Sequence, residues 1–273
     1  MTAQPLPQID RDNWRKYAAP ELCPTQWTAV IAAAGKGSRL GYHLPKILFP
    51  VAGRPMLEWL LDLVQPFCGT AVFVLSPDGG SHVEPLLQPF MPGRYRIVTQ
   101  AQPKGMGDAV SIGAANVVTP YTAVIWGDQV ALRADSVAIS ARLHTGYLQP
   151  DLTIPTVLRD RPYIHFERHL DGRISRLLQA REGDSMPSRG ESDAGFFCFK
   201  TEVLRRLLEE IHLQAAAQGA RTAEFNLLPV IPYAAQHGYK VLTPHIMDVA
   251  ETVGINSPAD AELVAQYLRR ADV

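Results

Sequence analysis

The stretch Ala29–Arg39 reads AVIAAAGKGSR and joins an apolar run to a loop with two glycines. The run Ala29–Ala34 is short and continuous, which is typical of a strand buried in a parallel sheet. The loop carries Lys36 and Arg39, and Lys46 follows a few residues later. Glycines let backbone N–H groups approach an anion, and lysine and arginine add charge-assisted hydrogen bonds to phosphate oxygens. The stretch therefore predicts a polyphosphate site at the carboxyl end of the first strand.

Other glycine-rich loops fit the same stretch less well. A Walker A loop ends in Gly-Lys-Ser or Gly-Lys-Thr, whereas this loop reads Gly-Lys-Gly-Ser. A dinucleotide-binding loop would place its third glycine at Leu40, but the glycine is Gly41. Most glycine-rich turns only let the chain reverse. The cations at Arg39 and after Pro45 favour a phosphate site over that simpler interpretation.

The composition is that of an ordinary globular protein. The chain has 273 residues, 47% of them hydrophobic and 19% charged, with a net charge of −1. It can therefore bury a core, and it lacks the basic excess of a nucleic-acid binder. Cys23, Cys68 and Cys198 show no metal-ligand spacing, which predicts free thiols in a reduced compartment. Because no signal sequence and no apolar run of ~20 residues is found, we expect a cytoplasmic protein without a membrane partner.

Strands alternate with helices along the first half of the chain, which predicts an α/β, Rossmann-like fold with a mostly parallel sheet and right-handed crossovers. Short apolar runs mark the strands, and apolar residues at helical spacing mark the helices. The expected strands are 29–34, 71–75, 95–99 and 123–126, and the expected helices are 55–67, 82–90 and 107–118.

The second half favours a subregion built from hairpins. Asp171-Gly172 lies between the alternating runs 163–169 and 173–179, and this dipeptide is a strong hairpin signal. The last helix begins at Ser257-Pro258, a typical helix start. Further strands are expected at 152–158, 194–200 and 240–243, with a helix at 202–216 and no assignment for 224–237.

We expect three parts along the chain. Residues 1–26 form an N-terminal extension with a short helix near 12–17. Residues 27–130 form the nucleotide-binding half of a single domain. Residues 131–273 form its acceptor-binding half and closing helix.

Two polar positions follow elements that end at the same edge as the phosphate loop. An apolar strand ends in Gly127-Asp128, and Asn256 precedes the last helix. Ligands of open α/β sheets bind outside the carboxyl ends of the strands, and a carboxylate beside phosphates is a common Mg²⁺ ligand. The alternatives are a turn that begins at Gly-Asp and a loop that only caps a helix. We favour Asp128 as a metal ligand, whereas Asn256 as a second ligand needs further support.

The segment QAQPKGMGDA (100–109) follows a strand and opens a helix. The Gln100 amide can both donate and accept, which suits the imide edge of a pyrimidine. Gly105 and Gly107 would let a flat base lie against the backbone. The histidines show no zinc spacing and the chain has no Gly-x-Ser-x-Gly, so zinc and serine-hydrolase chemistry lack support.

Together these motifs resemble the sugar-1-phosphate nucleotidylyltransferases, and most of all the uridylyltransferase domain of bifunctional N-acetylglucosamine-1-phosphate uridylyltransferases. The resemblance runs from about Trp27 to the C-terminus. It implies a glycosyltransferase-A-like fold, Mg²⁺ as cofactor, and a nucleoside triphosphate and a phosphorylated acceptor as substrates. The hexapeptide-repeat acetyltransferase domain is missing, so no acetyl transfer is expected. The motifs are Gly35-x-Gly37-x-Arg39, Pro45-Lys46, Gln100 with Gly105-x-Gly107, Gly127-Asp128 and Gly254-Ile255-Asn256.

The resemblance also implies a role for each matching residue. Arg39, Lys46 and Asp128 would be catalytic, and Asp128 and Asn256 would hold Mg²⁺. The nucleotide-binding residues would be Ala33, Ala34, Gly35, Lys36, Gly37, Gln100, Gly105, Met106 and Gly127. The acceptor-binding residues would be Ile164, Gln179, Arg181 and Asp193.

The acceptor positions depart from the family pattern. The family's sugar-contacting acid falls at Gln179, an asparagine at Asp193, a pocket glycine at Ile164 and a threonine near the uracil at Met106. We expect an enzyme that joins an NTP to a sugar 1-phosphate and releases pyrophosphate, with UTP favoured and dTTP or CTP left open. One alternative is a CTP- or UTP-dependent transferase for a non-sugar phosphate or phosphonate such as phosphocholine. The other is a non-catalytic regulator that binds nucleotide sugars.

Overall fold

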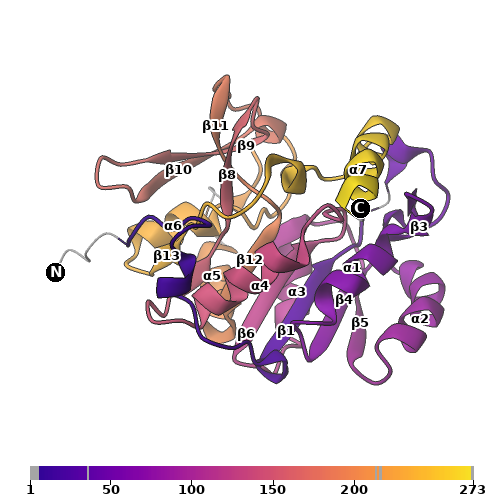
Figure 1. The fold of residues 1–273 in the computed structure, drawn as a ribbon. Coiled ribbons are helices and arrows are strands. Elements are labelled where there is room, and N and C mark those ends of the chain that lie inside the picture. Colours follow the sequence, from indigo (N-terminus) through magenta and orange to yellow (C-terminus); the bar gives the residue numbers. More distant parts are fainter. Residues whose placement is uncertain (1–5, 36, 213, 215–216, 272–273) are drawn as a thin grey trace.

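A seven-stranded, mostly parallel sheet forms the centre of the protein (Figure 1), in the order β13-β7-β12-β6-β1-β4-β5. The computed structural model describes residues 6–35, 37–212, 214 and 217–271. The predicted first strand is β1 (Trp27–Ala32), and all of its residues are buried. It pairs in parallel with β4 (Thr70–Leu75) and β6 (Tyr121–Trp126), which confirms the α/β class. The other strands of the sheet are β5 (Tyr95–Thr99), β7 (Leu152–Thr153), β13 (Val241–Leu242) and β12 (Phe196–Lys200), which runs antiparallel to β6.

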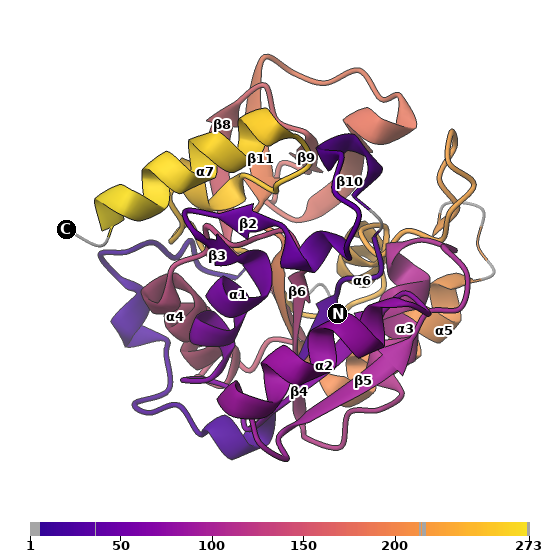
Figure 2. The ribbon, with the colours of Figure 1, turned by 90° about the vertical axis from the view of Figure 1, so that its right-hand side faces the viewer.

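Helices cover both faces of the sheet, which explains why the strand sequences are apolar throughout. Successive residues of β1 point to opposite faces, so Ile31 and Val30 belong to two separate core clusters. Figure 2 shows α1 and α4 on one side of the sheet and α3 and α5 on the other. The first side is covered by α1 (Met56–Val64), α2 (Gly79–Phe90), α4 (Ala134–His144) and α7 (Pro258–Ala271). The second is covered by α3 (Met106–Ala114), α5 (Thr201–His212) and α6 (Val230–Gln236).

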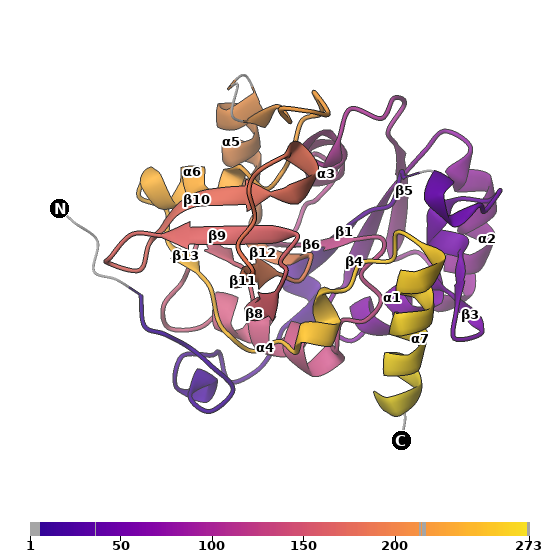
Figure 3. The ribbon, with the colours of Figure 1, turned by 90° about the horizontal axis from the view of Figure 1, so that it is seen from above.

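Two antiparallel strand pairs form the second subregion (Figures 1 and 3). The predicted hairpin joins β9 (Ile164–Arg168) to β10 (Ile174–Gln179), and Gly172 in its turn has a φ of +84°, which glycine adopts without strain. The second pair is β8 (Thr156–Asp160) with β11 (Arg189–Asp193). The hairpin-rich subregion is therefore present.

Three elements differ from the prediction. The expected strand 152–158 is divided into β7 and β8, because Pro155 lies between them and has no N–H to donate to a ladder. Strand β11 was not predicted, because its sequence, RGESD, shows no alternation of apolar and polar residues. Helix α4 was also missed, since its buried face carries Ser136, Ser140 and His144 at helical spacing.

Helix α7 begins as predicted, because the Asp260 N–H donates to Ser257 Oγ at 3.2 Å. The segment 224–237, left without an assignment, contains α6.

Among the described residues, no helix combines the length and apolar character needed to cross a membrane. The short elements are η1 (Trp14–Lys16), η2 (Pro24–Gln26), η3 (Ser38–Leu40), η4 (Lys46–Leu48), β2 (Pro50–Val51), β3 (Arg54–Pro55), η5 (Ala180–Glu182) and η7 (Val249–Thr252).

The N-terminal extension packs along α4. Trp14 in η1, the expected short helix, belongs to the core and is 7% exposed. Arg11 pairs with Asp135 at 3.0 Å and donates to Ser136 Oγ at 2.8 Å, both at the start of α4. The described part of the extension therefore contributes to the core of the domain.

Candidate active site

The loop after β1 leads directly to two short helices that carry the predicted cations. Arg39 lies in η3, and Lys46 begins η4. Between them the chain must pass close to itself, because a Cβ at Gly37 would lie 3.0 Å from the Lys46 side chain. Gly37 also has a φ of +62°, a backbone conformation that favours glycine. Lys36, predicted to bind the nucleotide, lies outside the described residues.

Four predicted residues from distant parts of the chain meet at this loop. Lys46 Nζ lies 2.5 Å from an Asp128 carboxylate oxygen and donates to the Asn256 amide oxygen at 3.0 Å. Arg39 Nη2 donates to the same amide oxygen at 3.3 Å. The backbone also joins the two oxygen-bearing segments, since the Ile255 N–H donates to the Asp128 carbonyl at 3.1 Å. Asp128 and Asn256 are 82 and 210 positions from Lys46 in sequence.

A cavity of about 250 Å³, which we call the reaction cavity, opens over this cluster. Gly127 and Ala33 both line it and lie close together, since a Cβ at Gly127 would lie 2.8 Å from that of Ala33. The predicted residues that line the cavity are Ala33, Gly35, Gly37, Arg39, Lys46, Met106, Gly127, Asp128, Arg181 and Asn256. The sequence reasoning missed Ala32, Ser38 and Ile47, each of which directly adjoins a predicted residue. Ala34, Gln100, Gly105, Ile164, Gln179 and Asp193 do not line it.

The donor atoms of the cluster fit a hard divalent cation. Asp128 and Asn256 each present an oxygen to one point, which the Lys46 ammonium occupies. Mg²⁺ prefers oxygen ligands and is commonly bound through one or two carboxylates together with substrate phosphates. No group of three or more His, Cys, Asp or Glu side chains suited to a metal is found among the described residues. The protein would therefore supply only part of the coordination shell, and Arg39, Lys46 and Arg181 would attract the phosphates.

The predicted base-binding residues make contacts within the protein. The Gln100 side-chain amide donates to the Gly105 carbonyl at 3.0 Å and to Asp108 at 2.8 Å. A Cβ at Gly105 would lie 2.5 Å from the Phe225 carbonyl, and the Gly107 N–H donates to the same carbonyl at 2.8 Å. These glycines therefore allow the segment around Phe225 to approach the backbone of residues 104–107.

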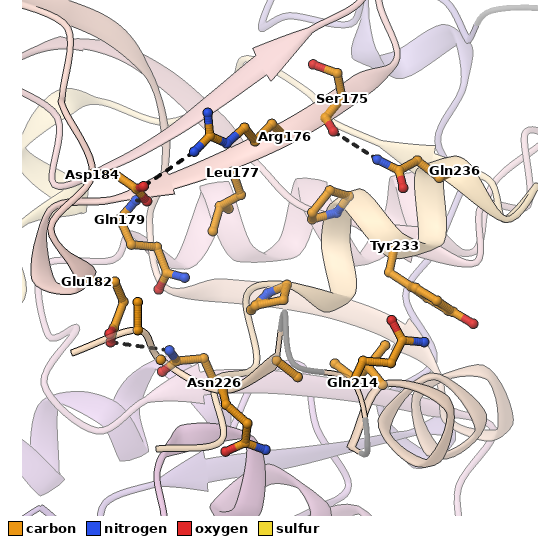
Figure 4. A pocket seen from close by; sticks show the side chains of 17 residues that line it. Ser175, Arg176, Leu177, Gln179, Glu182, Asp184, Gln214, Asn226, Tyr233 and Gln236 are labelled. Carbon is orange, nitrogen blue, oxygen red and sulfur yellow. Dashed lines mark hydrogen bonds and ion pairs between the residues drawn. The ribbon is translucent and has the colours of Figure 1, made fainter. Parts of the chain in front are cut away.

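The predicted acceptor residues are divided between two cavities. Arg181 lines the reaction cavity and pairs with Glu224 at 2.8 Å. Gln179 lines a second cavity of about 460 Å³, between β10 and α6, together with Glu182, Asn226 and Tyr233 (Figure 4). The two cavities share no lining residue among those described.

The other two predicted acceptor residues, Ile164 and Asp193, line neither cavity. Ile164 is opposite Gln179 in the hairpin and packs against the apolar cluster on the α3 side of the sheet. Asp193 is 7% exposed, and its carboxylate accepts a hydrogen bond from the Gly195 N–H at 2.9 Å. Burial raises the pKa of Asp193, although the Gly195 hydrogen bond acts in the opposite direction. Neither residue reaches the reaction cavity.

Bifunctional proteins named GlmU match most of this chain over about half of their own length. A GlmU bifunctional protein from Mycolicibacterium paratuberculosis is 28% identical over 256 residues, which cover 90% of this chain and 51% of that protein. A GlmU bifunctional protein from Desulfitobacterium hafniense is 30% identical over 253 residues, which cover 89% of this chain and 52% of that protein. The chain therefore spans about half the length of the curated relatives it matches.

Two solved structures share the fold, and a family model covers more than half of the chain. The inositol-1-phosphate CTP transferase from T. maritima has a TM-score of 0.65 at 16% identity, over 90% of this chain and 98% of that one. A UDP-glucose pyrophosphorylase in complex with UDP-glucose has a TM-score of 0.67 at 14% identity, over 89% of this chain and 98% of that one. At such identities the likeness is one of fold. Because the model described as the MobA-like NTP transferase domain matches residues 29–193, the chain belongs to the family of MobA-like NTP transferase domains.

Proposed function

We propose that the protein joins a nucleoside triphosphate, with UTP as the expected substrate, to a sugar 1-phosphate and releases pyrophosphate. The observation that supports this proposal is the convergence of Arg39, Lys46, Asp128 and Asn256 beside the glycine loop at one edge of the sheet. Cations and oxygen ligands in one cavity suit a reaction in which phosphate charge is bound and redistributed. Membership in the family of MobA-like NTP transferase domains supports the same class of reaction.

The chemistry needs no protein nucleophile. An oxygen of the acceptor phosphate forms a bond to the α-phosphorus of the NTP. The bond from that phosphorus to the bridging oxygen breaks, and its electron pair leaves with pyrophosphate. Because the acceptor phosphate is already anionic, no strong general base is required, and the protein acts by positioning and by charge neutralisation.

Each side chain of the cluster has a defined part in this scheme. Arg39 and Lys46 bind the phosphates and stabilise the charge that develops on the leaving pyrophosphate. Asp128 and Asn256 would hold Mg²⁺, which supplies charge neutralisation on phosphate oxygens when bound. The glycine loop at Gly35 and Gly37 lets the phosphates approach the backbone.

A second candidate keeps the chemistry and changes the acceptor. Gln179 and Asp193 depart from the sugar-binding pattern, and neither lines the reaction cavity. A CTP- or UTP-dependent transfer to a non-sugar phosphate, such as phosphocholine, fits these departures. The T. maritima neighbour, a CTP transferase for inositol 1-phosphate, shares the fold. A regulator that only binds nucleotide sugars is disfavoured, since it would not need the Lys46–Asp128–Asn256 cluster. A cytoplasmic location stays a prediction from the sequence.

The decisive experiment measures pyrophosphate release with Mg²⁺ for every pairing of UTP, dTTP, CTP and ATP with sugar 1-phosphates, inositol 1-phosphate and phosphocholine. We expect turnover with one pair, abolished by EDTA. Asp128→Ala should lose more than the ~100-fold that removal of one charge-stabilising group commonly costs. The matched control is Asp160→Ala. It removes a carboxylate whose side chain is 83% exposed, and this substitution should not affect turnover. No turnover with any pair, or equal turnover in both variants, would refute the proposal.

A further inference from the structure

Glu182, which no sequence pattern singled out, follows Arg181 in η5 and accepts four hydrogen bonds from a single loop. Its Oε2 accepts from the backbone N–H groups of Arg221 at 3.0 Å and Thr222 at 3.3 Å. Its Oε1 accepts from Thr222 Oγ1 at 2.9 Å and from Asn226 Nδ2 at 3.3 Å. Burial acts to raise the pKa of Glu182, but these hydrogen bonds outweigh it and lower the pKa below its usual value. The carboxylate is therefore charged at neutral pH and fully used in holding residues 219–226.

The same loop, residues 219–226, contacts the segment predicted to face the base. The Phe225 N–H donates to the Lys104 carbonyl at 2.8 Å, and the Phe225 carbonyl accepts from the Gly107 N–H at 2.8 Å. A side chain at Gly105 would collide with this loop, so the two backbones lie in direct contact. The loop therefore joins η5 to residues 104–107.

Arg181 is attached to this loop from the side of the reaction cavity. Its guanidinium pairs with Glu224 at 2.8 Å, while its neighbour Glu182 points away, toward the second cavity. Figure 4 shows Glu182 reaching Asn226 at one end of that second cavity. The Arg181 side chain is about half exposed, and an exposed ion pair is a weak restraint by itself. The multiple hydrogen bonds of Glu182 are the stronger attachment of η5.

We propose that Glu182 is a positioning residue, which holds Arg181 in the orientation that binds the phosphate of the acceptor. This inference rests on the proposed function, because it assigns Arg181 to that phosphate. The alternative is a purely structural role, in which Glu182 only stabilises the fold of the loop. The two differ in one respect: a positioning residue acts through Arg181, and a purely structural residue does not.

The test is a double-mutant cycle of Glu182→Ala and Arg181→Ala, with KM for acceptor and NTP measured separately. We expect Glu182→Ala to raise the acceptor KM about tenfold or more and to change the NTP KM by less than about threefold. In the Arg181→Ala background the same substitution should change the acceptor KM by less than about twofold. Glu182→Gln keeps one acceptor oxygen and should fall between Glu182→Ala and wild type. An exposed carboxylate on α5 provides the control, Glu202→Ala.

Equal effects of Glu182→Ala in the two backgrounds, or equal increases in both KM values, would overturn the inference. Hydrogen exchange supplies a readout that needs no turnover. The amides of Arg221 and Thr222 should exchange faster in Glu182→Ala, and unchanged exchange would overturn the inference whatever the activity. A wild-type protein without turnover would instead refute the proposed function, and exchange would then decide whether Glu182 holds the loop.

Discussion

Replacing Lys46 by methionine should strengthen the binding of Mg²⁺ to the protein without nucleotide, while it abolishes most of the proposed activity. The Lys46 ammonium lies 2.5 Å from Asp128 and 3.0 Å from the Asn256 amide oxygen, so it competes for both expected metal ligands. Methionine keeps much of the side-chain length and volume but carries no charge. The substitution thus removes the competitor and leaves the two oxygens in place.

The magnitude follows from the burial of the pair. The Lys46 and Asp128 side chains are 14% and 22% exposed, so solvent screens their interaction only in part. A hydrogen bond to a charged group contributes about 1.5–3 kcal/mol net. Since about 1.4 kcal/mol corresponds to a tenfold change in affinity, Lys46→Met should raise the Mg²⁺ affinity about 10- to 100-fold.

Isothermal titration with MgCl₂ at low salt measures this change directly. Arg39→Met is the matched control, because Arg39 contacts Asn256 at 3.3 Å without an ion pair to Asp128. Its effect on Mg²⁺ affinity should be several-fold smaller. An unchanged or lower Mg²⁺ affinity in Lys46→Met would refute the idea that Lys46 and the metal share these ligands. An equal increase in Arg39→Met would instead indicate a general effect of net charge.

Two further predictions concern stability. His144 is buried, and desolvation lowers its pKa from 6.5 to about 3. Between these values only the unfolded chain takes up the proton, so the free energy of unfolding should fall as the pH drops below 6.5, by up to about 3 kcal/mol at pH 4.5. Urea unfolding of His144→Gln should show a smaller loss than wild type, and identical losses would contradict the assignment. Trp14→Ala should lower the free energy of unfolding by about 3–5 kcal/mol, because this side chain of the extension is 7% exposed in the core. A loss below about 1 kcal/mol would show that the extension unfolds separately.

Local sequence patterns predicted the strands of the sheet and the loops at their carboxyl ends, because each of these features depends on residues that are neighbours in sequence. The continuous apolar run before Gly35 is compatible with a strand covered on both faces. Asp171-Gly172 predicts its hairpin through the positive φ that glycine adopts. Helix α4 was not predicted, because its buried face carries the polar residue Ser136, whose hydroxyl donates a hydrogen bond to Glu251 in a distant segment. Such a partner becomes visible only when the chain has folded.

For the candidate site too, some features follow from the sequence and others only from the tertiary structure. The sequence by itself determined which residue types are available for phosphate binding, because glycines, cations and an aspartate at the ends of strands keep the same chemical properties in any fold. Only the tertiary structure decided which of them meet. It placed Asn256 beside Asp128 and directed Gln179 and Arg181, two positions apart, to different cavities. It also gave Glu182 its partners in residues 219–226. These outcomes depend on contacts between segments far apart in the chain, and such contacts leave no periodic trace in the sequence.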